Sequence, residues 1–377
     1  MVRVAALEGQ MSSPQVLALV SDAFGGHGGI ALYMRDVLRC VASLESSPSI
    51  TLLARTGRAG GVEIPPNIRW ATEALKGKWP FIRALFAAMA KGPKPDLILC
   101  GHINLLPMAR LAAFRFGAPL VLFIHGIEAW KPPTKLLSRK LAASPDHVLA
   151  VSQITLQRFL SWNTFTSARA TVMPNAIKLD RYGLGPKNPV LLARHGIQGK
   201  RVLMTLGRLS TVQRHKGVDE VIAVLPRLLN RFPDLVYLVA GGGDDIPRLQ
   251  QKATSVGVSD QVVFTGRVDE VEKSDYYRLA DAFALTGRGD GFGFVLLEAM
   301  ACGVPVVASV LDGSQEAVLN GELGFLVNPD EPDSLVQGLA KALKQPNAIP
   351  SRLSYFSYEN FCRRLTAVLS PMMRRAV

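Results

Sequence analysis

The sequence is poor in cysteine, in aromatic residues and in long apolar runs. Its four cysteines lie far apart and form no Cys-x-x-Cys pair, so neither a disulfide framework nor a zinc site is predicted. No apolar run reaches the ~18 residues of a membrane-spanning helix. The N-terminal residues lack the pattern of a secretory signal peptide. We therefore expect a globular protein of the reducing cytoplasm.

Acidic residues are also scarce relative to basic ones. The 377 residues include 30 Asp and Glu against 43 Lys and Arg, which gives a net charge of +13. A positive balance of this size favours an anionic partner: nucleic acid, anionic lipid or a phosphorylated substrate. Aromatic residues make up only 7% of the chain, too few beside the basic groups for a base-stacking surface. We expect no nucleic-acid partner.

Short β-branched apolar runs alternate with helical patterns from end to end. This alternation is typical of α/β domains with parallel sheets. Two such series are separated by a polar stretch, rich in Pro and Gly, that ends near Lys200. We expect a first domain over residues 1–174, a second over residues 175–352 and, within residues 353–377, an amphipathic helix that crosses back to the first.

The most informative stretch covers residues 286–312. Its glycines predict a loop over residues 287–293, followed by an apolar helix over 294–302 and a short strand over 306–309. A glycine-rich loop that leads into a helix is typical of a ligand cradle, because the helix N-terminus offers free amides to an anion.

Glu298 is the only charged residue between Asp290 and Asp312. A carboxylate among apolar neighbours is costly to bury unless a partner hydrogen-bonds it, and we expect that partner to be a ligand. The alternative is that Glu298 faces water on an amphipathic helix. At ~1.5 Å per residue along a helix, Asp290 and Glu298 would lie roughly 12 Å apart and hold two ends of one long ligand.

Several further motifs occur in a fixed order. They are MPNAI at residues 173–177, GRL at 207–209, KG at 216–217, AGGGDD at 240–245, FTGRV at 264–268 and the acidic stretch above. Together they resemble the retaining glycosyltransferases of family four. The resemblance covers the second domain and, more weakly, the first. It implies an α/β protein of two facing Rossmann-like domains, the glycosyltransferase-B fold.

The resemblance also implies roles for individual residues. Arg208 and Lys216 would hold the diphosphate of a nucleotide sugar, since fixed cations stabilise the departing diphosphate; solvated loop charges are the alternative. Glu298 would bind the ribose hydroxyls. The family has Glu at the first acidic position, near the donor sugar, where this sequence has the shorter Asp290. Further donor-binding candidates are Gly207, Gly291, Phe292, Gly293, Phe294 and Glu316.

In the first domain the family places a glycine loop after the first strand and a histidine after a central strand. The glycines correspond to Gly26, Gly28 and Gly29, and the histidine to His125, which follows the apolar run 120–124. His125 would position the donor sugar or its anomeric centre; a structural histidine is the alternative. Lower-ranked cleft candidates are His27, His102 and Glu128.

Residues 75–94 combine apolar and basic side chains. The apolar ones are Trp79, Phe81, Ile82, Leu85, Phe86 and Met89, and the basic ones are Lys76, Lys78, Arg83, Lys91 and Lys94. This composition suits an interfacial helix on anionic lipid, and equally a core helix with a solvated edge.

We expect a retaining hexosyltransferase that moves mannose or glucose from GDP-mannose or UDP-glucose to a lipid-linked or growing polysaccharide acceptor. Exopolysaccharide or cell-envelope glycan synthesis is the expected setting, at the cytoplasmic face of the inner membrane. No metal or cofactor is expected, because Arg208, Lys216 and the helix dipole neutralise the diphosphate.

Two alternatives remain open. The first is a nucleotide-sugar-binding scaffold without catalysis, suggested by Asp290. The second is an NAD-dependent dehydrogenase, suggested by Gly26-x-Gly28-x-x-Ala31 after a strand. No acidic residue closes the second strand at residues 50–54, and the motifs of the second domain would then go unexplained.

Overall fold

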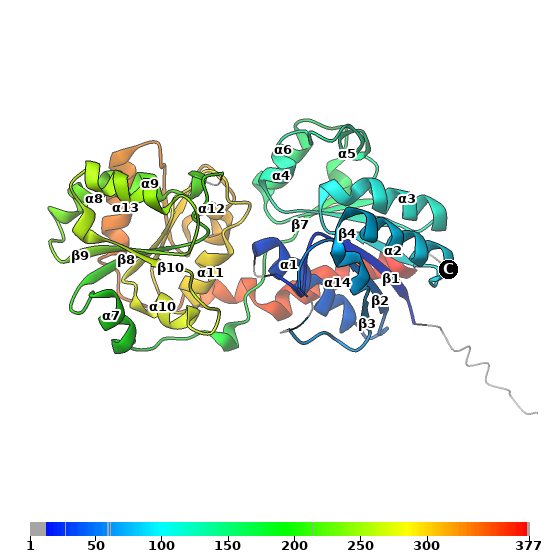
Figure 1. The fold of residues 1–377 in the computed structure, drawn as a ribbon, viewed down its shortest axis with the longest axis horizontal. Coiled ribbons are helices and arrows are strands. Elements are labelled where there is room, and N and C mark those ends of the chain that lie inside the picture. Colours follow the sequence, from blue (N-terminus) through cyan, green and yellow to red (C-terminus); the bar gives the residue numbers. More distant parts are fainter. Residues whose placement is uncertain (1–12, 27, 59, 61, 213, 375–377) are drawn as a thin grey trace, which may run out of the picture. The chain divides into compact units, whose positions relative to one another are not determined.

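The computed structural model describes residues 13–26, 28–58, 60, 62–212 and 214–374. These residues form two parallel sheets, each flanked by helices (Figure 1). The strand orders are β3-β2-β1-β4-β5-β6-β7 and β10-β9-β8-β11-β12-β13. In each sheet the order reverses beside the first strand, between β1 and β4 and between β8 and β11. Such reversals create a crevice at the carboxyl ends of the strands, where α/β proteins bind ligands.

The first sheet is built from the apolar runs that the sequence predicts as strands. Every residue of β5, for example, is buried, as expected for a parallel strand covered on both faces. Its strands are β1 (Gln15–Val20), β2 (Ser49–Ala54), β3 (Ile68–Trp70), β4 (Leu97–Cys100), β5 (Leu120–Ile124), β6 (His147–Ala150) and β7 (Ala170–Val172). The helices of this half are α1 (Gly29–Ala42), α2 (Lys78–Lys91), α3 (Leu106–Phe116), α4 (Ile127–Trp130), α5 (Leu136–Leu141) and α6 (Gln153–Leu160).

The second sheet repeats the pattern. Its strands are β8 (Arg201–Leu206), β9 (Leu235–Ala240), β10 (Val262–Gly266), β11 (Ala282–Leu285), β12 (Val306–Ser309) and β13 (Phe325–Val327). The helices are α7 (Pro189–His195), α8 (Val218–Leu229), α9 (Ile246–Ser255), α10 (Lys273–Leu279), α11 (Phe294–Ala301), α12 (Ser314–Ala317), α13 (Pro332–Ala342) and, last, α14 (Tyr358–Arg374). Helices α8, α9 and α13 cover one face of the sheet, and α10 and α11 cover the other (Figure 1).

The core between α8, α13 and the second sheet consists of buried apolar side chains and Tyr237, whose hydroxyl donates to Thr205 Oγ1 at 2.8 Å. They include Val221, Leu225, Tyr237, Val239, Leu335 and Leu339. Helix α8 begins after Gly217 with two acidic residues, Asp219 and Glu220, in its first turn. Carboxylates at this end are favoured by the helix dipole. The loops that leave the carboxyl edge of the sheet therefore connect strands and helices that are packed on a common core.

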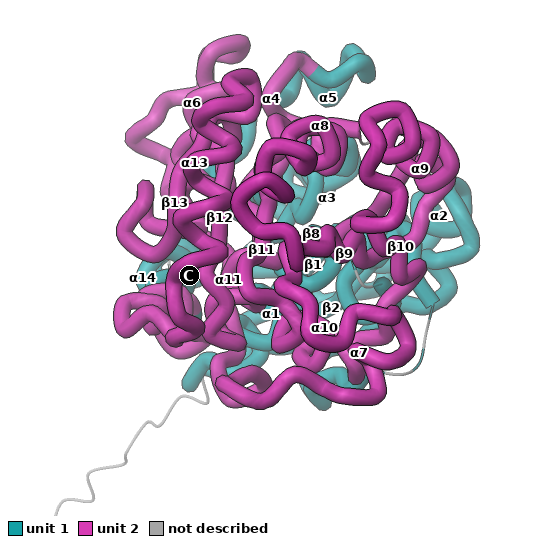
Figure 2. The backbone as a smooth tube through the Cα atoms, turned by 90° about the vertical axis from the view of Figure 1, so that its left-hand side faces the viewer, with its two compact units in different colours: residues 1–123, 133–148, 362–377 teal, residues 124–132, 149–361 magenta. Residues whose placement is uncertain are grey.

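Contacts within the chain divide it into two compact units (Figure 2). The first comprises Met1–Phe123, Pro133–Val148 and Cys362–Val377, and the second comprises Ile124–Pro132 and Leu149–Phe361. Most of α14 thus groups with the first unit. The segments that follow β5 and β6 belong to the second unit, although β5 and β6 are strands of the first sheet. The division by contacts therefore differs from the division by sheets at these segments. The boundary predicted at residue 174 follows sheet membership and stays a prediction.

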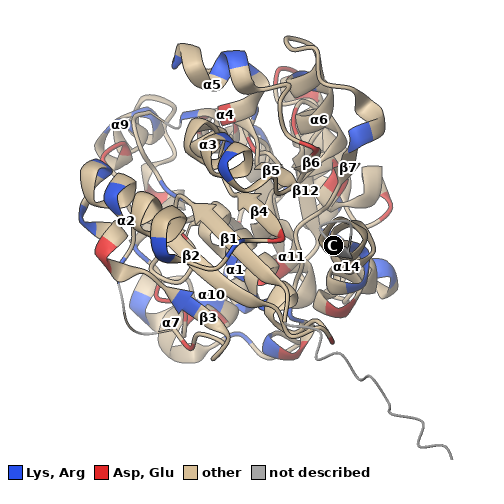
Figure 3. Ribbon diagram, turned by 90° about the vertical axis from the view of Figure 1, so that its right-hand side faces the viewer, with Lys and Arg blue, Asp and Glu red and all other residues tan. Residues whose placement is uncertain are grey.

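Basic side chains recur on α2, α3 and α5 (Figure 3). Between Glu73 and Asp146 the sequence has eleven Lys and Arg and only two acidic residues, Asp96 and Glu128. Among the described residues, no helix has both the length and the apolar character that crossing a bilayer requires.

Candidate functional site

Two loops meet at the carboxyl edge of the second sheet, beside the reversal between β8 and β11. One follows β8 and ends at Gly217, and the other follows β11. The amide of Arg288 donates to the carbonyl oxygen of His215 at 2.8 Å. A Cβ on Gly287 would lie 2.3 Å from that same oxygen, and a Cβ on Gly217 would lie 2.5 Å from the carbonyl carbon of Thr286. Only glycine permits so close an approach, and the two loops therefore form one surface.

Lys216 and Asp290 form an ion pair across these loops. Asp290 is only 9% exposed, and its Oδ2 atom has no hydrogen-bond partner among the described residues. The backbone of Asp290 is fixed, because its amide donates to Asp312 Oδ2 at 2.9 Å and its carbonyl accepts from the amide of Gly313 at 2.8 Å. The site therefore presents an oriented carboxylate with one buried acceptor atom available to a ligand.

Asp312 organises the loop after β12. Its Oδ1 atom accepts from the amide of Ser314 at 3.0 Å and from the Ser314 hydroxyl at 2.6 Å. Burial, together with the nearby charge of Asp290, raises the pKa of the Asp312 carboxyl to about 7. Ser314 is fully buried, and its hydroxyl also accepts from the amide of Ser309 at 3.1 Å. Both side chains thus hold the loop on which Asp290 rests.

Glu298 is 1% exposed, so the alternative in which it faces water is wrong. The expected hydrogen-bonding partner exists, but the protein supplies it. Glu298 Oε1 accepts from Lys273 Nζ at 2.6 Å and from Tyr182 Oη at 2.8 Å, and Oε2 accepts from Tyr277 Oη at 2.6 Å. Burial and the charge of Glu298 raise the pKa of Tyr277.

Sequence reasoning missed these three donors. Lys273 and Tyr277 are four residues apart at the start of α10, a spacing that places both side chains on one face of a helix. That spacing was the available signal, whereas nothing near Tyr182 indicated its role. The helical rise used to estimate the distance between Asp290 and Glu298 does not apply before Phe294, where α11 begins, and the roughly 12 Å stays a prediction.

Arg208 is exposed and makes no hydrogen bond or ion pair with any residue that the structure describes. Its neighbour Gly207 continues the pairing of β8, with its amide donating to the carbonyl of Ala240 at 3.0 Å. The guanidinium is therefore a cation that a ligand at this edge can reach. Its predicted contact with a diphosphate stays a prediction.

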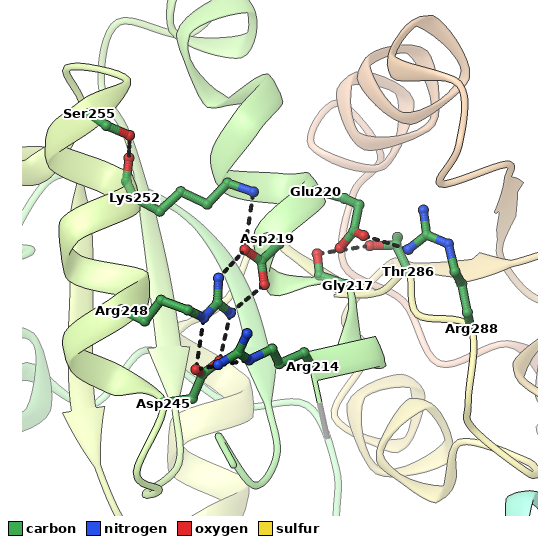
Figure 4. Close-up of polar contacts among 10 residues, drawn as sticks. All are labelled: Arg214, Gly217, Asp219, Glu220, Asp245, Arg248, Lys252, Ser255, Thr286 and Arg288. Atoms are coloured by element: carbon green, nitrogen blue, oxygen red, sulfur yellow. Dashed lines mark hydrogen bonds and ion pairs between the residues drawn. The ribbon is translucent and has the colours of Figure 1, made fainter. Parts of the chain in front are cut away.

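A charged network ties the start of α8 to the loop after β9. Figure 4 shows Arg248 between two carboxylates, with bonds of 2.7 Å to each oxygen of Asp219 and of 2.8 and 2.6 Å to Asp245. Lys252 donates to Asp219 at 3.1 Å, and Arg214 lies 3.4 Å from Asp245. Asp219, which follows the KG motif, is thus fully engaged in holding these elements together.

Arg288 extends this scaffold to the loop that carries Asp290. Its guanidinium binds Glu220 in α8 and Asp330 after β13, with Nε 3.0 Å from Asp330 Oδ1. Arg288 therefore links the glycine-rich loop to α8 and to the loop after β13.

His125 and Glu128 lie at the turn into α4. The amide of His125 donates to Glu128 Oε1 at 2.6 Å, and the amide of Gly126 to the same atom at 3.2 Å. A Cβ on Gly291 would lie 1.7 Å from the carbonyl oxygen of His125. The structure therefore brings the backbone of His125 against the glycine-rich loop, and it gives Glu128 a local role in that turn.

The carboxylate of Glu316, a residue of α12, lies at the N-terminus of α6. Its two oxygens accept from the amides of Gln153 at 2.6 Å and Ile154 at 3.0 Å. Burial raises the pKa of Glu316. Its carboxylate is thus engaged by protein amides, and its predicted donor contact stays a prediction.

The other predicted residues are distributed as follows. Phe292 is buried with its ring 5.6 Å from that of Phe356, and Phe294 lies 6.0 Å from Lys273 Nζ. Gly293, at φ +85°, caps α11. Gly28 and Gly29 are exposed at the start of α1 in the first unit. His102 Nδ1 accepts from the amide of Asn104. His27 lies outside the described residues.

Comparison with known sequences now identifies the family. Residues 191–359 match the family described as "Glycosyl transferases group 1", and residues 27–181 match "Glycosyltransferase Family 4". The chain belongs to glycosyltransferase family four. The predicted family is therefore confirmed, and the matched segments cover the second sheet and every strand of the first sheet except β1.

Two relatives of this family-four chain are named for sugar transfer. It is 35% identical over 252 residues to the GDP-mannose-dependent alpha-(1-6)-phosphatidylinositol monomannoside mannosyltransferase of Mycolicibacterium smegmatis, a match over 64% of each chain. The chain therefore spans just under two thirds of that relative. It is 28% identical to the D-inositol 3-phosphate glycosyltransferase of Nocardiopsis dassonvillei over 85% of this chain and 83% of the relative.

Solved structures confirm the predicted glycosyltransferase-B fold. Anabaena HepE, crystallised with UDP and glucose, aligns with a TM-score of 0.74 at 21% identity, over 95% of this chain and 100% of HepE. The lipopolysaccharide outer core galactosyltransferase WaaB aligns with a TM-score of 0.70 at 17% identity, over 94% of this chain and 99% of WaaB.

Proposed function

We propose that this family-four chain is a hexosyltransferase that moves mannose or glucose from a nucleoside-diphosphate sugar to a hydroxyl of a lipid-linked or growing polysaccharide acceptor. The observation that carries the proposal is the ion pair of Lys216 with Asp290, whose Oδ2 is buried and unpartnered. A cation and a hydrogen-bond acceptor side by side match the phosphate and the hydroxyls of a nucleotide sugar.

The chemistry follows from these groups. A diphosphate would compete with Asp290 for the Lys216 ammonium, and the exposed Arg208 would supply a second cation. Both stabilise the diphosphate most as the glycosidic bond breaks, when its negative charge grows. Asp290 Oδ2 would accept a sugar hydroxyl, and the first amides of α11 would face the anion. We propose that the configuration at the anomeric carbon is retained, with the departing diphosphate taking the acceptor proton.

GDP-mannose is the donor that we favour, followed by UDP-glucose. The Mycolicibacterium relative is named as GDP-mannose-dependent, and HepE was crystallised with UDP and glucose. A lipid-linked acceptor is favoured because that relative is named for a phosphatidylinositol mannoside. A role in exopolysaccharide or cell-envelope glycan synthesis is part of the proposal.

A panel of nucleotides tests the proposal. GDP, UDP, ADP and their sugars are added to the protein, and the midpoint of thermal unfolding is measured. A ligand at 100 times its Kd adds about 2.7 kcal/mol to the free energy of unfolding, so the correct base should give a clear upward shift. Transfer assays with the same donors then separate an enzyme from a binding scaffold. If no nucleotide shifts the midpoint, the proposal is wrong.

We also propose that the first unit docks on anionic membrane through α2, α3 and α5. The largest exposed apolar side chains there are Trp79 (69% exposed), Phe86 (52%) and Phe114 (82%). Basic residues on the same three helices complement anionic headgroups. Of the apolar residues predicted to form an interfacial face, Phe81, Leu85 and Met89 are buried in the core. The interpretation as a core helix therefore holds for one face of α2, and the interpretation as an interfacial helix, which concerns the exposed face, stays a prediction.

Vesicle binding tests this surface. The wild type should sediment with anionic vesicles at low salt and less with neutral vesicles, because both charge and apolar insertion contribute. Replacing Trp79, Phe86 and Phe114 together with alanine should lower the partition coefficient about tenfold or more. The control replaces Val190 and Val271, exposed apolar residues of the second unit, with alanine and should bind like the wild type. Equal binding to neutral and anionic vesicles would contradict this docking mode.

A further inference from the structure

Two buried carboxylates share one ammonium group at the carboxyl edge of the second sheet. Asp290 is 9% exposed and Asp312 is fully buried, and the Asp290 amide donates to Asp312 Oδ2 at 2.9 Å. Lys216 forms an ion pair with Asp290, whereas Asp312 forms no ion pair with any residue that the structure describes. If both carboxylates are ionised, the cluster keeps a net negative charge, which is costly to bury.

Groups that can carry charge face the Asp312 loop from the loops after β8 and β11, from α6 and from α12. They are Lys216, His215, Asp290, Arg158 and Glu316. Arg158 donates to the carbonyl oxygen of Leu311 at 2.9 Å, and Glu316 accepts from amides at the start of α6. Burial and Lys216 lower the pKa of His215, so its ring is neutral near pH 7. Asp290 is thus the charge that acts most directly on Asp312.

The Asp312 carboxyl has a position for one proton. Its Oδ1 atom accepts hydrogen bonds from the amide and the hydroxyl of Ser314, which occupy both lone pairs. Among the described residues, only the Asp290 amide donates to Oδ2, so one lone pair remains there. Burial and the charge of Asp290 raise the pKa of this carboxyl to about 7. A change in the surrounding charge therefore alters its protonation near neutral pH.

We propose that Asp312 is a positioning residue that takes up a proton when a nucleoside-diphosphate sugar binds. The inference rests on the proposed function, because it takes the donor diphosphate as the anion that pairs with Lys216. Asp290 then shares its counterion with the ligand, and the negative charge near Asp312 increases. This increase favours the neutral carboxyl, so a proton moves from solvent to Asp312 and returns to solvent when the diphosphate leaves. The proton takes the remaining lone pair, and Asp312 continues to hold the backbone of Asp290.

The sign of the pH dependence follows from linkage. Because the complex binds the proton more tightly than the free protein, the donor binds more tightly when Asp312 is protonated. Donor affinity should therefore fall as the pH rises through the pKa of about 7 that Asp312 has in the free protein. We expect Kd to rise about fivefold between pH 6.5 and pH 8.5.

Calorimetry of donor binding tests the proposal. GDP-mannose and UDP-glucose are the probes, because their diphosphates are esterified at both ends and lack the proton with a pKa of about 6 that a terminal phosphate carries. Kd is measured at several values between pH 6.5 and pH 8.5. Binding enthalpies at pH 7.5 are compared in Tris and in MOPS, two buffers with different heats of ionisation. The comparison should show an uptake of about half a proton per donor bound.

Four variants locate the proton. Asp312→Asn lacks the titrating group and should reduce the uptake to about zero and the change in Kd to less than about twofold. Asp290→Asn leaves Asp312 in place, lowers its pKa, and should reduce the uptake at pH 7.5. His215→Asn should keep the uptake. Asp333→Asn is the control, because Asp333 is an exposed carboxylate paired with Arg227, and it should behave like the wild type.

The outcomes separate this inference from the proposed function. Donor binding by the wild type without proton uptake overturns the inference and leaves the proposed function intact. The inference also fails if the uptake persists in Asp312→Asn or is lost in His215→Asn. If Asp312→Asn does not fold, unchanged uptake in Asp290→Asn overturns it instead. Absence of binding by any nucleotide sugar overturns the proposed function, and this inference with it.

Discussion

Replacing Lys216 with alanine is expected to lower the rate of sugar transfer by about 100- to 1,000-fold while the protein stays folded. Among the described residues, Lys216 is the one cation in direct contact with Asp290 across the two loops. Its charge acts most strongly on the departing diphosphate, so the loss should fall on kcat more than on KM. The measurement is the turnover of the preferred donor, with circular dichroism to check the fold.

Lys252→Ala is the matched control for this prediction. Lys252 also forms an ion pair in the second unit, with its Nζ 3.1 Å from Asp219. This pair belongs to the network around Arg248 and does not involve Asp290. Its removal should change turnover by less than about threefold. Near-normal turnover of Lys216→Ala would remove Lys216 from the mechanism and with it the main support for the proposed site.

Asp312 is expected to make the protein less stable as the pH rises from about 4 to about 7. Its carboxyl has a pKa of about 7 in the folded protein, raised by burial and by Asp290, against an ordinary value of 3.8. The folded state therefore binds the proton more tightly than the unfolded chain. The resulting stabilisation is fully present below the unfolded pKa and is lost as the pH rises through the folded one. The difference between the two pKa values corresponds to a loss of about 4 kcal/mol in the free energy of unfolding.

Asp312→Asn removes this titration and should remove its share of the pH dependence. The free energy of unfolding is measured by urea titration at several values between pH 4 and pH 8. From pH 4 to pH 8, the free energy of unfolding of the variant should rise by about 4 kcal/mol relative to that of the wild type. The altered hydrogen bonds of the variant add a difference that does not change with pH. Asp290→Asn removes the neighbouring charge, which is the second cause of the raised pKa of Asp312. Its free energy of unfolding should therefore rise by less than that of Asp312→Asn, relative to the wild type, over the same pH range. Parallel pH profiles for wild type and Asp312→Asn would refute the assignment.

The sequence predicted the fold well because fold information is local. Apolar runs such as residues 306–309 and the helix expected at 294–302 appear as β12 and as α11, which ends one residue earlier. Their patterns depend on neighbours within a few positions, which a sequence shows directly. The glycines of the two loops were equally visible, although the carbonyl groups that require them were not.

The site could be predicted only in part, because its partners are distant along the chain. The sequence indicated that Glu298 needs a hydrogen-bonding partner, but one of its donors, Tyr182, is 116 residues away. Likewise, Glu316 contacts amides of α6 that lie more than 160 residues earlier. Such pairings arise from tertiary packing, and no local pattern encodes them. The apolar residues of α2 illustrate a second limit, since both faces of that helix are apolar and periodicity alone does not say which is buried.

The loop after β11 alternates between two kinds of position. A Cβ at residue 287 or 291 would lie within 2.3 Å of the backbone oxygen of His215 or His125, and a Cβ at residue 289 would lie 2.1 Å from the His215 ring. A side chain at these sites therefore requires a neighbouring group to move. The positions at which a substitution needs no such shift of the opposite loop are those between them, Arg288, Asp290 and Phe292. Since Arg288 fixes the loop and Phe292 is buried, one position remains as an adjustable determinant. Asp290→Glu, which introduces the residue that the family pattern has at this position, is therefore the single substitution in this loop that we expect to change the donor contact.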